Sequence, residues 1–188
     1  KLLRMSNNKL SSLPQSFANL QNLQQLQLVG NKFEYFPSIL FKLPKLKELS
    51  LKKNQIQIIE CSLEIIEGVT KLTELDLSYN NLQYLPDEFT HLKSVKVCNL
   101  EHNKLDKLPV SWKSMTSIHL INFKNNNLNT IPKSLFIETT VVRIDIDDNP
   151  VHSSKKYVHL EGFEEFSERH KKHWDKGDQM GADRTHHT

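Results

Sequence analysis

The chain has 188 residues, a formal net charge of +3 and 37% apolar side chains, which supports one domain with a continuous hydrophobic core. No apolar run approaches the ~18 residues of a membrane-spanning helix, so we expect no membrane insertion. Two cysteines, Cys61 and Cys98, are too few for a disulfide-stapled scaffold or a four-cysteine zinc module. Without a secretion leader we expect a cytoplasmic, reducing location, with a cytoskeletal, ciliary or organellar assembly as the alternative.

An internal repeat runs through most of the chain. Seven asparagines recur at intervals of 23, 23, 26, 23, 23 and 23 residues: Asn8, Asn31, Asn54, Asn80, Asn103, Asn126 and Asn149. The positions eight, five and three residues before each asparagine and two residues after it are apolar in all 27 cases that the chain contains. Chance agreement of this kind has a probability on the order of 10⁻¹². A fixed period of this length predicts a solenoid.

Each repeat begins with a short segment of period two, such as Leu26-Gln27-Leu28. This alternation predicts a strand with apolar side chains turned inward, paired in parallel with the equivalent strand of the next repeat. The asparagine amide both donates and accepts, so we expect it to satisfy backbone groups where the chain leaves the strand. Pairs such as Leu13-Pro14 follow in five repeats, and proline favours an extended segment or a tight helical turn there.

The spacing of these residues resembles the leucine-rich repeat pattern L-x-x-L-x-L-x-x-N-x-L over residues 1–151. The resemblance implies an α/β fold, a leucine-rich repeat solenoid or horseshoe with a concave parallel β-sheet and an irregular convex face. Residues 1–151 would then hold seven repeats, the first one truncated. The 23-residue period, the leucine-proline pairs and the lack of cysteine-rich caps are similar to the intracellular class, of the Ras-suppressor and Scribble type.

An amphipathic helix is expected after the last repeat. Leu160, Phe163, Phe166 and Trp174 recur at helical spacing with charged residues between them. We expect residues 152–177 to form a C-terminal capping helix that lays this stripe over the last repeat, with Gly177 as its stop signal. The alternative is that this helix binds an external partner. The polar residues 178–188 are expected to form a flexible tail.

The first repeat starts in mid-strand at Lys1, with no polar segment in front of Leu3 and Met5. Its strand edge and the core beneath it would therefore be exposed. We expect this N-terminal edge to be covered by further repeats or by a neighbouring subunit.

Patterns that carry catalytic or ligand chemistry are weak, so we expect no enzyme activity, no cofactor and no small-molecule substrate. Asp145-x-Asp147-x-Asn149 resembles the start of a calcium loop, but proline and lysine stand where that loop needs glycine and glutamate. His170 and His173 lie three residues apart without further ligands nearby, so no metal site is expected. Cys98 takes an inward strand position and is interpreted as a core residue.

The outward positions of the strands form the candidate binding surface. Basic side chains gather in the first three repeats and acidic ones in the last, and Tyr79 beside His102 is the expected anchor. Nucleic acid is disfavoured because the chain carries an excess of only three positive charges. The candidate partner-binding residues are Arg4, Lys52, Lys53, Asp76, Tyr79, Asn99, Glu101, His102, Asn122, Lys124, Asp145 and Asp147.

The resemblance implies that the chain binds other proteins. We predict a non-catalytic protein-protein interaction module that acts as an adaptor or scaffold through its concave face. One alternative is an architectural subunit of a large axonemal, mitochondrial or ribosomal assembly. Another is the recognition domain of a longer multidomain signalling enzyme.

Overall fold

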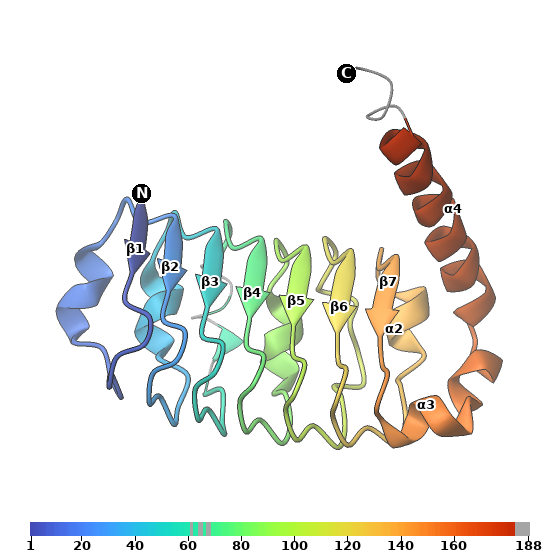
Figure 1. The fold of residues 1–188 in the computed structure, drawn as a ribbon, viewed down its shortest axis with the longest axis horizontal. Coiled ribbons are helices and arrows are strands. Elements are labelled where there is room, and N and C mark those ends of the chain that lie inside the picture. Colours follow the sequence, from blue (N-terminus) through green and yellow to red (C-terminus); the bar gives the residue numbers. More distant parts are fainter. Residues whose placement is uncertain (61, 64–65, 67–68, 183–188) are drawn as a thin grey trace.

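The computed structural model describes residues 1–60, 62–63, 66 and 69–182, and of residues 174–182 it describes the backbone alone. Within these residues, seven three-residue strands form one parallel sheet in chain order, which stays open along its length (Figure 1). The strands are β1 (Leu2–Arg4), β2 (Gln25–Gln27), β3 (Glu48–Ser50), β4 (Glu74–Asp76), β5 (Val97–Asn99), β6 (Leu120–Asn122) and β7 (Arg143–Asp145).

Equivalent residues of successive repeats pair with one another, as Leu3 does with Leu26 and Leu26 with Leu49. Leu26 and Leu28, the two inward residues of the second repeat, are both buried. The same holds through the sixth repeat, so the residues at these positions stack into one continuous core. The period-two pattern of the sequence is thereby confirmed as a sheet with one apolar face.

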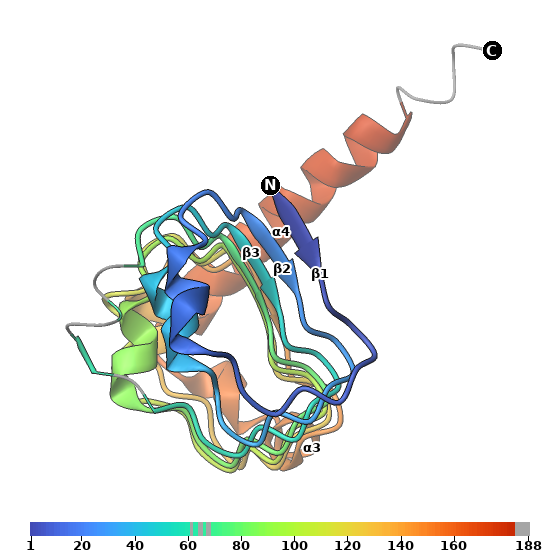
Figure 2. The ribbon, with the colours of Figure 1, turned by 90° about the vertical axis from the view of Figure 1, so that its left-hand side faces the viewer.

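The side opposite the sheet carries short helical turns (Figure 2). Three of them begin directly after a proline, because proline fixes φ and its missing N–H is not needed at the start of a helical turn. This confirms the irregular outer face that the leucine-proline pairs predict. The turns are η1 (Gln15–Asn19), η2 (Ser38–Lys42), η3 (Asp87–His91) and the one-turn helix α2 (Ser134–Ile137).

A ladder of asparagine amides closes each repeat against the one before it. Asn31 Nδ2 donates to the carbonyl oxygens of Leu28 (3.0 Å) and Met5 (2.9 Å), and its Oδ1 accepts from the backbone N–H of Leu10 (3.1 Å). Each amide thus satisfies backbone groups of two repeats that would otherwise be buried unpaired. The same pattern holds at Asn54, Asn80, Asn103, Asn126 and Asn149.

The residue before each asparagine has a positive φ, between 51° and 67°. This left-handed conformation turns the chain at the end of the strand, and it favours glycine, asparagine and aspartate. Those types occupy Asn7, Gly30, Asn125 and Asp148, whereas Lys53, Tyr79 and His102 hold the same conformation in the three central repeats. The sequence analysis did not identify this turn. The asparagine, glycine and aspartate found directly before four of the seven repeat asparagines could have indicated it.

The segment after the last repeat differs from the single helix predicted over residues 152–177. It forms α3 (Pro150–Ser154), η4 (Lys156–His159) and α4 (Phe163–Ala182). Lys155 and Gly162, with φ of 50° and 83°, break the helix twice. Gly177 lies inside α4, since a glycine within a helix costs only about 1 kcal/mol. The Trp174 side chain and residues 183–188 of the predicted tail lie outside the described part.

Aromatic packing attaches α4 to the last repeat. The rings of Phe163 and Phe166 lie 5.6 Å and 5.3 Å from that of Phe136, measured between centroids. Phe136 and Phe166 are buried, and Phe163 packs against the same core. The first turns of α4 therefore cover the end of the solenoid, and the rest of the helix extends away from it (Figure 1).

Two polar side chains of α4 reach the backbone of the last repeat. Arg169 donates from Nη2 to the Phe136 carbonyl at 2.8 Å and from Nε to that of Val141 at 3.3 Å. His170 Nδ1 lies 2.8 Å from the Val142 carbonyl oxygen and must donate to it, because a carbonyl only accepts. These contacts satisfy carbonyl groups of α2 and of the residues just before β7.

The opposite end of the solenoid is open in the structure. The inward residues Leu3 and Met5 are only partly buried, and Leu2 is 41% exposed. Asn8 donates only within its own repeat, to Met5 and Ser6, and its side chain is exposed. In the described residues, β1 therefore pairs with β2 on one side only.

Candidate functional site

The outward side of the sheet is formed by the first and third residues of each strand and by the second and third residues after it. We call this surface the sheet face. All twelve candidate residues from the sequence lie on it, and each is at least partly exposed. The structure brings four of them together at its centre, namely Lys52, Lys53, Tyr79 and His102.

Tyr79 is the centre of this cluster. Its ring stacks on the imidazole of His102, with centroids 4.3 Å apart and planes inclined by 27°. The ammonium groups of Lys52 and Lys53 lie 5.1 Å and 5.9 Å from the ring centroid, within the range of cation–π attraction. Tyr79 keeps 38% of its surface exposed. The aromatic pair expected from the sequence is therefore present, and two lysines that come before it in the chain flank it.

Three of the candidate residues form hydrogen bonds to the backbone of their own repeat. Asp76, Asn99 and Asn122 each accept the backbone N–H two residues further on through Oδ1, at 3.0, 3.1 and 2.9 Å. This short-range bond shapes the turn after the strand. It also fixes the backbone at Glu101 and Lys124, so these three side chains position their neighbours.

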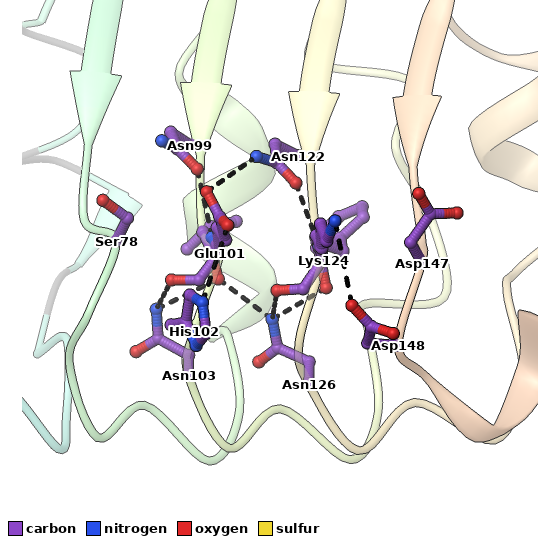
Figure 3. A network of polar contacts seen from close by, with 12 residues as sticks. Ser78, Asn99, Glu101, His102, Asn103, Asn122, Lys124, Asn126, Asp147 and Asp148 are labelled. Atoms are coloured by element: carbon purple, nitrogen blue, oxygen red, sulfur yellow. Dashed lines mark hydrogen bonds and ion pairs between the residues drawn. The ribbon is translucent and has the colours of Figure 1, made fainter.

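Charged side chains on the C-terminal half of the sheet face contact one another or a histidine (Figure 3). Glu101 lies 3.7 Å from His102 Nε2 and accepts from Asn122 at 3.4 Å, and Lys124 lies 3.8 Å from Asp148. Asp145 and Asp147 contact Arg143 and His152.

The N-terminal half of the sheet face differs in this respect. Among the described residues, Lys52 and Lys53 form no ion pair, and Arg4 bonds to the amide of Gln27 at 3.3 Å. Unneutralised ammonium groups therefore lie next to Tyr79.

A hollow of about 390 Å³ lies beside the cluster, over β2 to β5. Three carboxylates line it, those of Glu48, Glu74 and Asp76, together with the apolar side chain of Val97. The sequence analysis missed Glu48, Glu74 and Val97 because it began with the residue between the two strand leucines. Period two already implied that the first residue of each strand also faces outward.

Cys98 lies beneath this surface and is fully buried. Burial raises the pKa of its thiol far above the usual range, and the nearby Asp76 carboxylate adds to the shift. A thiol held protonated is a poor nucleophile, which agrees with a core role. Over the described residues, no three side chains of His, Cys, Asp or Glu gather closely enough to hold a metal ion. Nor is any helix in that part long and apolar enough to cross a membrane.

Two segments of the chain, residues 1–20 and 62–105, match family models described as leucine-rich repeat. These matches and the seven stacked strands decide the architecture. The chain is a leucine-rich repeat solenoid. Leucine-rich repeat domains typically bind other proteins, and neither the matches nor the described structure adds a catalytic domain.

Curated relatives share short stretches of this leucine-rich repeat solenoid. Mouse osteomodulin is 42% identical over 86 residues, which is 44% of this chain and 19% of that protein. Adenylate cyclase of Schizosaccharomyces pombe is 37% identical over 101 residues, 53% of this chain and 6% of that one. The rat volume-regulated anion channel subunit LRRC8D is 35% identical over 83 residues, 43% of this chain and 9% of that subunit. The chain thus spans under a fifth of each of these relatives.

Solved structures share the fold over a larger part. A leucine-rich repeat protein of Leptospira interrogans superposes on 87% of this chain and 47% of its own, with a TM-score of 0.64 and 29% identity. Toll, in the Drosophila Toll–Spatzle complex, covers 79% of this chain and 22% of its own, with a TM-score of 0.70 and 18% identity. These likenesses support the solenoid architecture.

Proposed function

We propose that this solenoid is a non-catalytic protein-interaction module, an adaptor or scaffold, that binds its partner through the sheet face. The observation that carries the proposal is the half-exposed stack of Tyr79 on His102 with Lys52 and Lys53 beside it. Aromatic side chains at the centre of a surface dominate the binding energy of protein interfaces. No cofactor, small-molecule substrate or nucleic acid is part of this proposal.

The backbone at this cluster gives further support. Lys53, Tyr79 and His102 occupy a left-handed position that suits asparagine or glycine better. A non-glycine residue there costs on the order of 1 kcal/mol. Three consecutive repeats at the centre of the sheet face carry this conformational strain. This is consistent with selection for the side chains of Lys53, Tyr79 and His102 rather than for stability.

We further propose that the protein belongs to the intracellular class of leucine-rich repeat proteins, of the Ras-suppressor and Scribble type, and works in the cytoplasm. The 23-residue period and the leucine-proline pairs support this class. The free thiol of Cys98 suits a reducing compartment.

A second candidate function is that of a fixed subunit in a larger assembly. The recognition domain of a longer signalling enzyme is a related candidate, since part of a yeast adenylate cyclase resembles this chain.

Site-specific photo-crosslinking in cells tests the proposal. A photoreactive phenylalanine analogue is placed at Tyr79, or at Val110, which is 83% exposed and lies outside the sheet face. We expect a defined set of proteins to crosslink at Tyr79 and not at Val110. Equal crosslinking at both positions, or capture at Val110 alone, would contradict binding through the sheet face.

Salt distinguishes the two candidate functions after crosslinking has identified the partners. An adaptor bound through exposed charges releases its partners as the salt concentration rises, because screening weakens such contacts. A fixed subunit attached through an apolar interface keeps its neighbours in constant ratio at high salt.

A further inference from the structure

The charges of the sheet face are divided across the strands as well as along the solenoid. Glu48 and Glu74 are the first residues of β3 and β4, whereas Lys52 and Lys53 follow the end of β3. The carboxylates line the hollow, and the ammonium groups lie against Tyr79. A partner that covers both regions therefore contacts a negative patch at the start of β3 and a positive patch just after its end.

Neither patch is neutralised by the residues that the structure describes. In the described part of the chain, Glu48, Glu74, Lys52 and Lys53 take part in no ion pair, and Glu48 accepts only a neutral hydrogen bond from Gln25 at 2.7 Å. On the C-terminal half of the same face, Lys124 pairs with Asp148 (Figure 3) and Arg143 pairs with Asp145. The unpaired half is the part whose charges remain for a partner.

We infer that this half of the sheet face binds an extended protein segment of opposite polarity, with a lysine or arginine in the hollow and an aspartate or glutamate at Lys52 and Lys53. The inference rests on the proposed function and names the chemistry of the partner. Glu48 and Lys52 are four residues apart, about 13 Å at 3.3 Å per residue. The segment therefore carries its two charges about four residues apart.

The surroundings of Tyr79 favour protein over nucleic acid. His102 stacks on the ring from the following repeat, and the ammonium groups of two lysines from the preceding repeat lie over it, so a base would have to displace one of them to stack. Recognition of single-stranded nucleic acid relies on such open aromatic faces. A phosphate backbone along the strands would also meet Glu48, Glu74 and Asp76.

Selection from a library of random linear peptides tests the inference on the full chain. The expected peptides carry a basic and an acidic residue about four positions apart. Reversal of either patch, by Lys52→Glu with Lys53→Glu or by Glu48→Lys with Glu74→Lys, is expected to weaken the selected peptide at least tenfold. The same reversals off the sheet face, Lys93→Glu with Lys113→Glu and Asp87→Lys with Asp106→Lys, serve as controls and leave affinity within about twofold.

Restored binding by a charge-exchanged peptide shows that the reversed variants have not simply misfolded. A peptide whose two charges are exchanged is expected to bind the protein in which all four residues are reversed, and to bind the original protein weakly. Circular dichroism of each variant checks that the repeats still form. Loss of binding without rescue in a folded variant overturns the proposed charge pattern.

A blocking variant separates this inference from the proposed function. Ser50→Trp fills the hollow and hinders any occupant of the sheet face, whatever its charge. If this variant abolishes binding while charge reversal does not, the sheet face binds but the polarity is wrong. If it has no effect, the peptides bind elsewhere and the proposed function falls as well. Failure to enrich any peptide, or displacement of a peptide by oligouridine RNA at equal concentration, also overturns the inference.

Discussion

At the scale of single residues, each turn of the solenoid depends on two adjacent residues with different structural roles. The first takes a positive φ and reverses the chain, and the second, an asparagine, bonds to backbone groups of its own repeat and the preceding one. The amide is buried in every repeat but the first, where Asn8 is exposed. Because a buried polar group costs most when its partner is removed, the ladder positions should be unequal in energy.

Asn103→Ala is expected to lower the free energy of unfolding by about 3 kcal/mol, since it removes three buried hydrogen bonds and leaves backbone groups unpaired. Those bonds join Asn103 to Leu77, Leu100 and Leu82, each at 3.0 Å. Asn8→Ala is the matched control, with an expected loss below about 1 kcal/mol. Urea unfolding followed by circular dichroism measures both, and equal losses would contradict the account of the ladder.

The Cys98 thiol should resist alkylation in the folded protein. Burial raises its pKa and bars access, so the reactive thiolate is scarce at neutral pH. A short pulse of N-ethylmaleimide, followed by mass spectrometry of the peptide that contains Cys98, measures the modified fraction. We expect little modification in buffer and complete modification in concentrated guanidinium chloride. Rapid labelling in buffer would show that the strand opens more often than its burial implies.

At the scale of elements, no strand or turn is stable by itself. Three residues make too few hydrogen bonds to hold a strand, so each forms only against its neighbours. The last repeat has no following strand to pack against, and the helix α4 covers it instead. This helix begins directly after Gly162, which has a φ of 83°. A side chain at this glycine would clash with Ile137 Cγ2 in α2, so a close approach requires glycine at the entry to α4.

Gly162→Ala is expected to destabilise the cap by about 2 kcal/mol, through contact with Ile137 and through strain at positive φ. Ile137→Ala should recover the steric part and leave about 1 kcal/mol of strain. Ile137 is itself exposed, so its own truncation should matter little. The thermal midpoints of the two single variants and the double variant measure the coupling. The same loss in both backgrounds would mean that the contact with Ile137 plays no part.

At the scale of the whole molecule, stability is a sum over contacts between neighbouring repeats, and the two ends receive different cover. The last repeat is covered by α4 through Phe163, Phe166 and Arg169. The first repeat has a neighbour on one side only, and its inward residues stay partly exposed. Local opening should therefore begin at the N-terminal end.

Amide hydrogen exchange can measure this gradient at two matched positions. Met5 and Leu77 donate the same bond to the next repeat, each at 2.8 Å, but only Leu77 has repeats on both sides. We expect Met5 to exchange on the order of 100-fold faster, because opening the first repeat breaks one set of neighbour contacts instead of two. Similar protection of both amides would indicate that the solenoid opens as a single unit.

Much of the fold could be predicted from the sequence because equivalent residues one repeat apart are also neighbours in space. The inward pairs, exemplified by Leu26 and Leu28, and the amide ladder follow from the period alone. The sequence predicts a helical cap, but both ends of the helix differ, because the chain turns at Gly162 with a positive φ and α4 continues past Gly177. On the sheet face, the pairing of Tyr79 with His102 was anticipated, and the hollow lined by Glu48 and Glu74 was not.

The sequence by itself thus determined the repeat, the inward and outward faces and the strands of the sheet. A periodic pattern encodes these features locally, and stacking only repeats them. The tertiary structure alone decided which outward charges are paired, as in Lys124 with Asp148, and which remain unpaired, as at Lys52 and Lys53. Pairing depends on how the long side chains of different repeats lie in space, and the sequence period does not specify that.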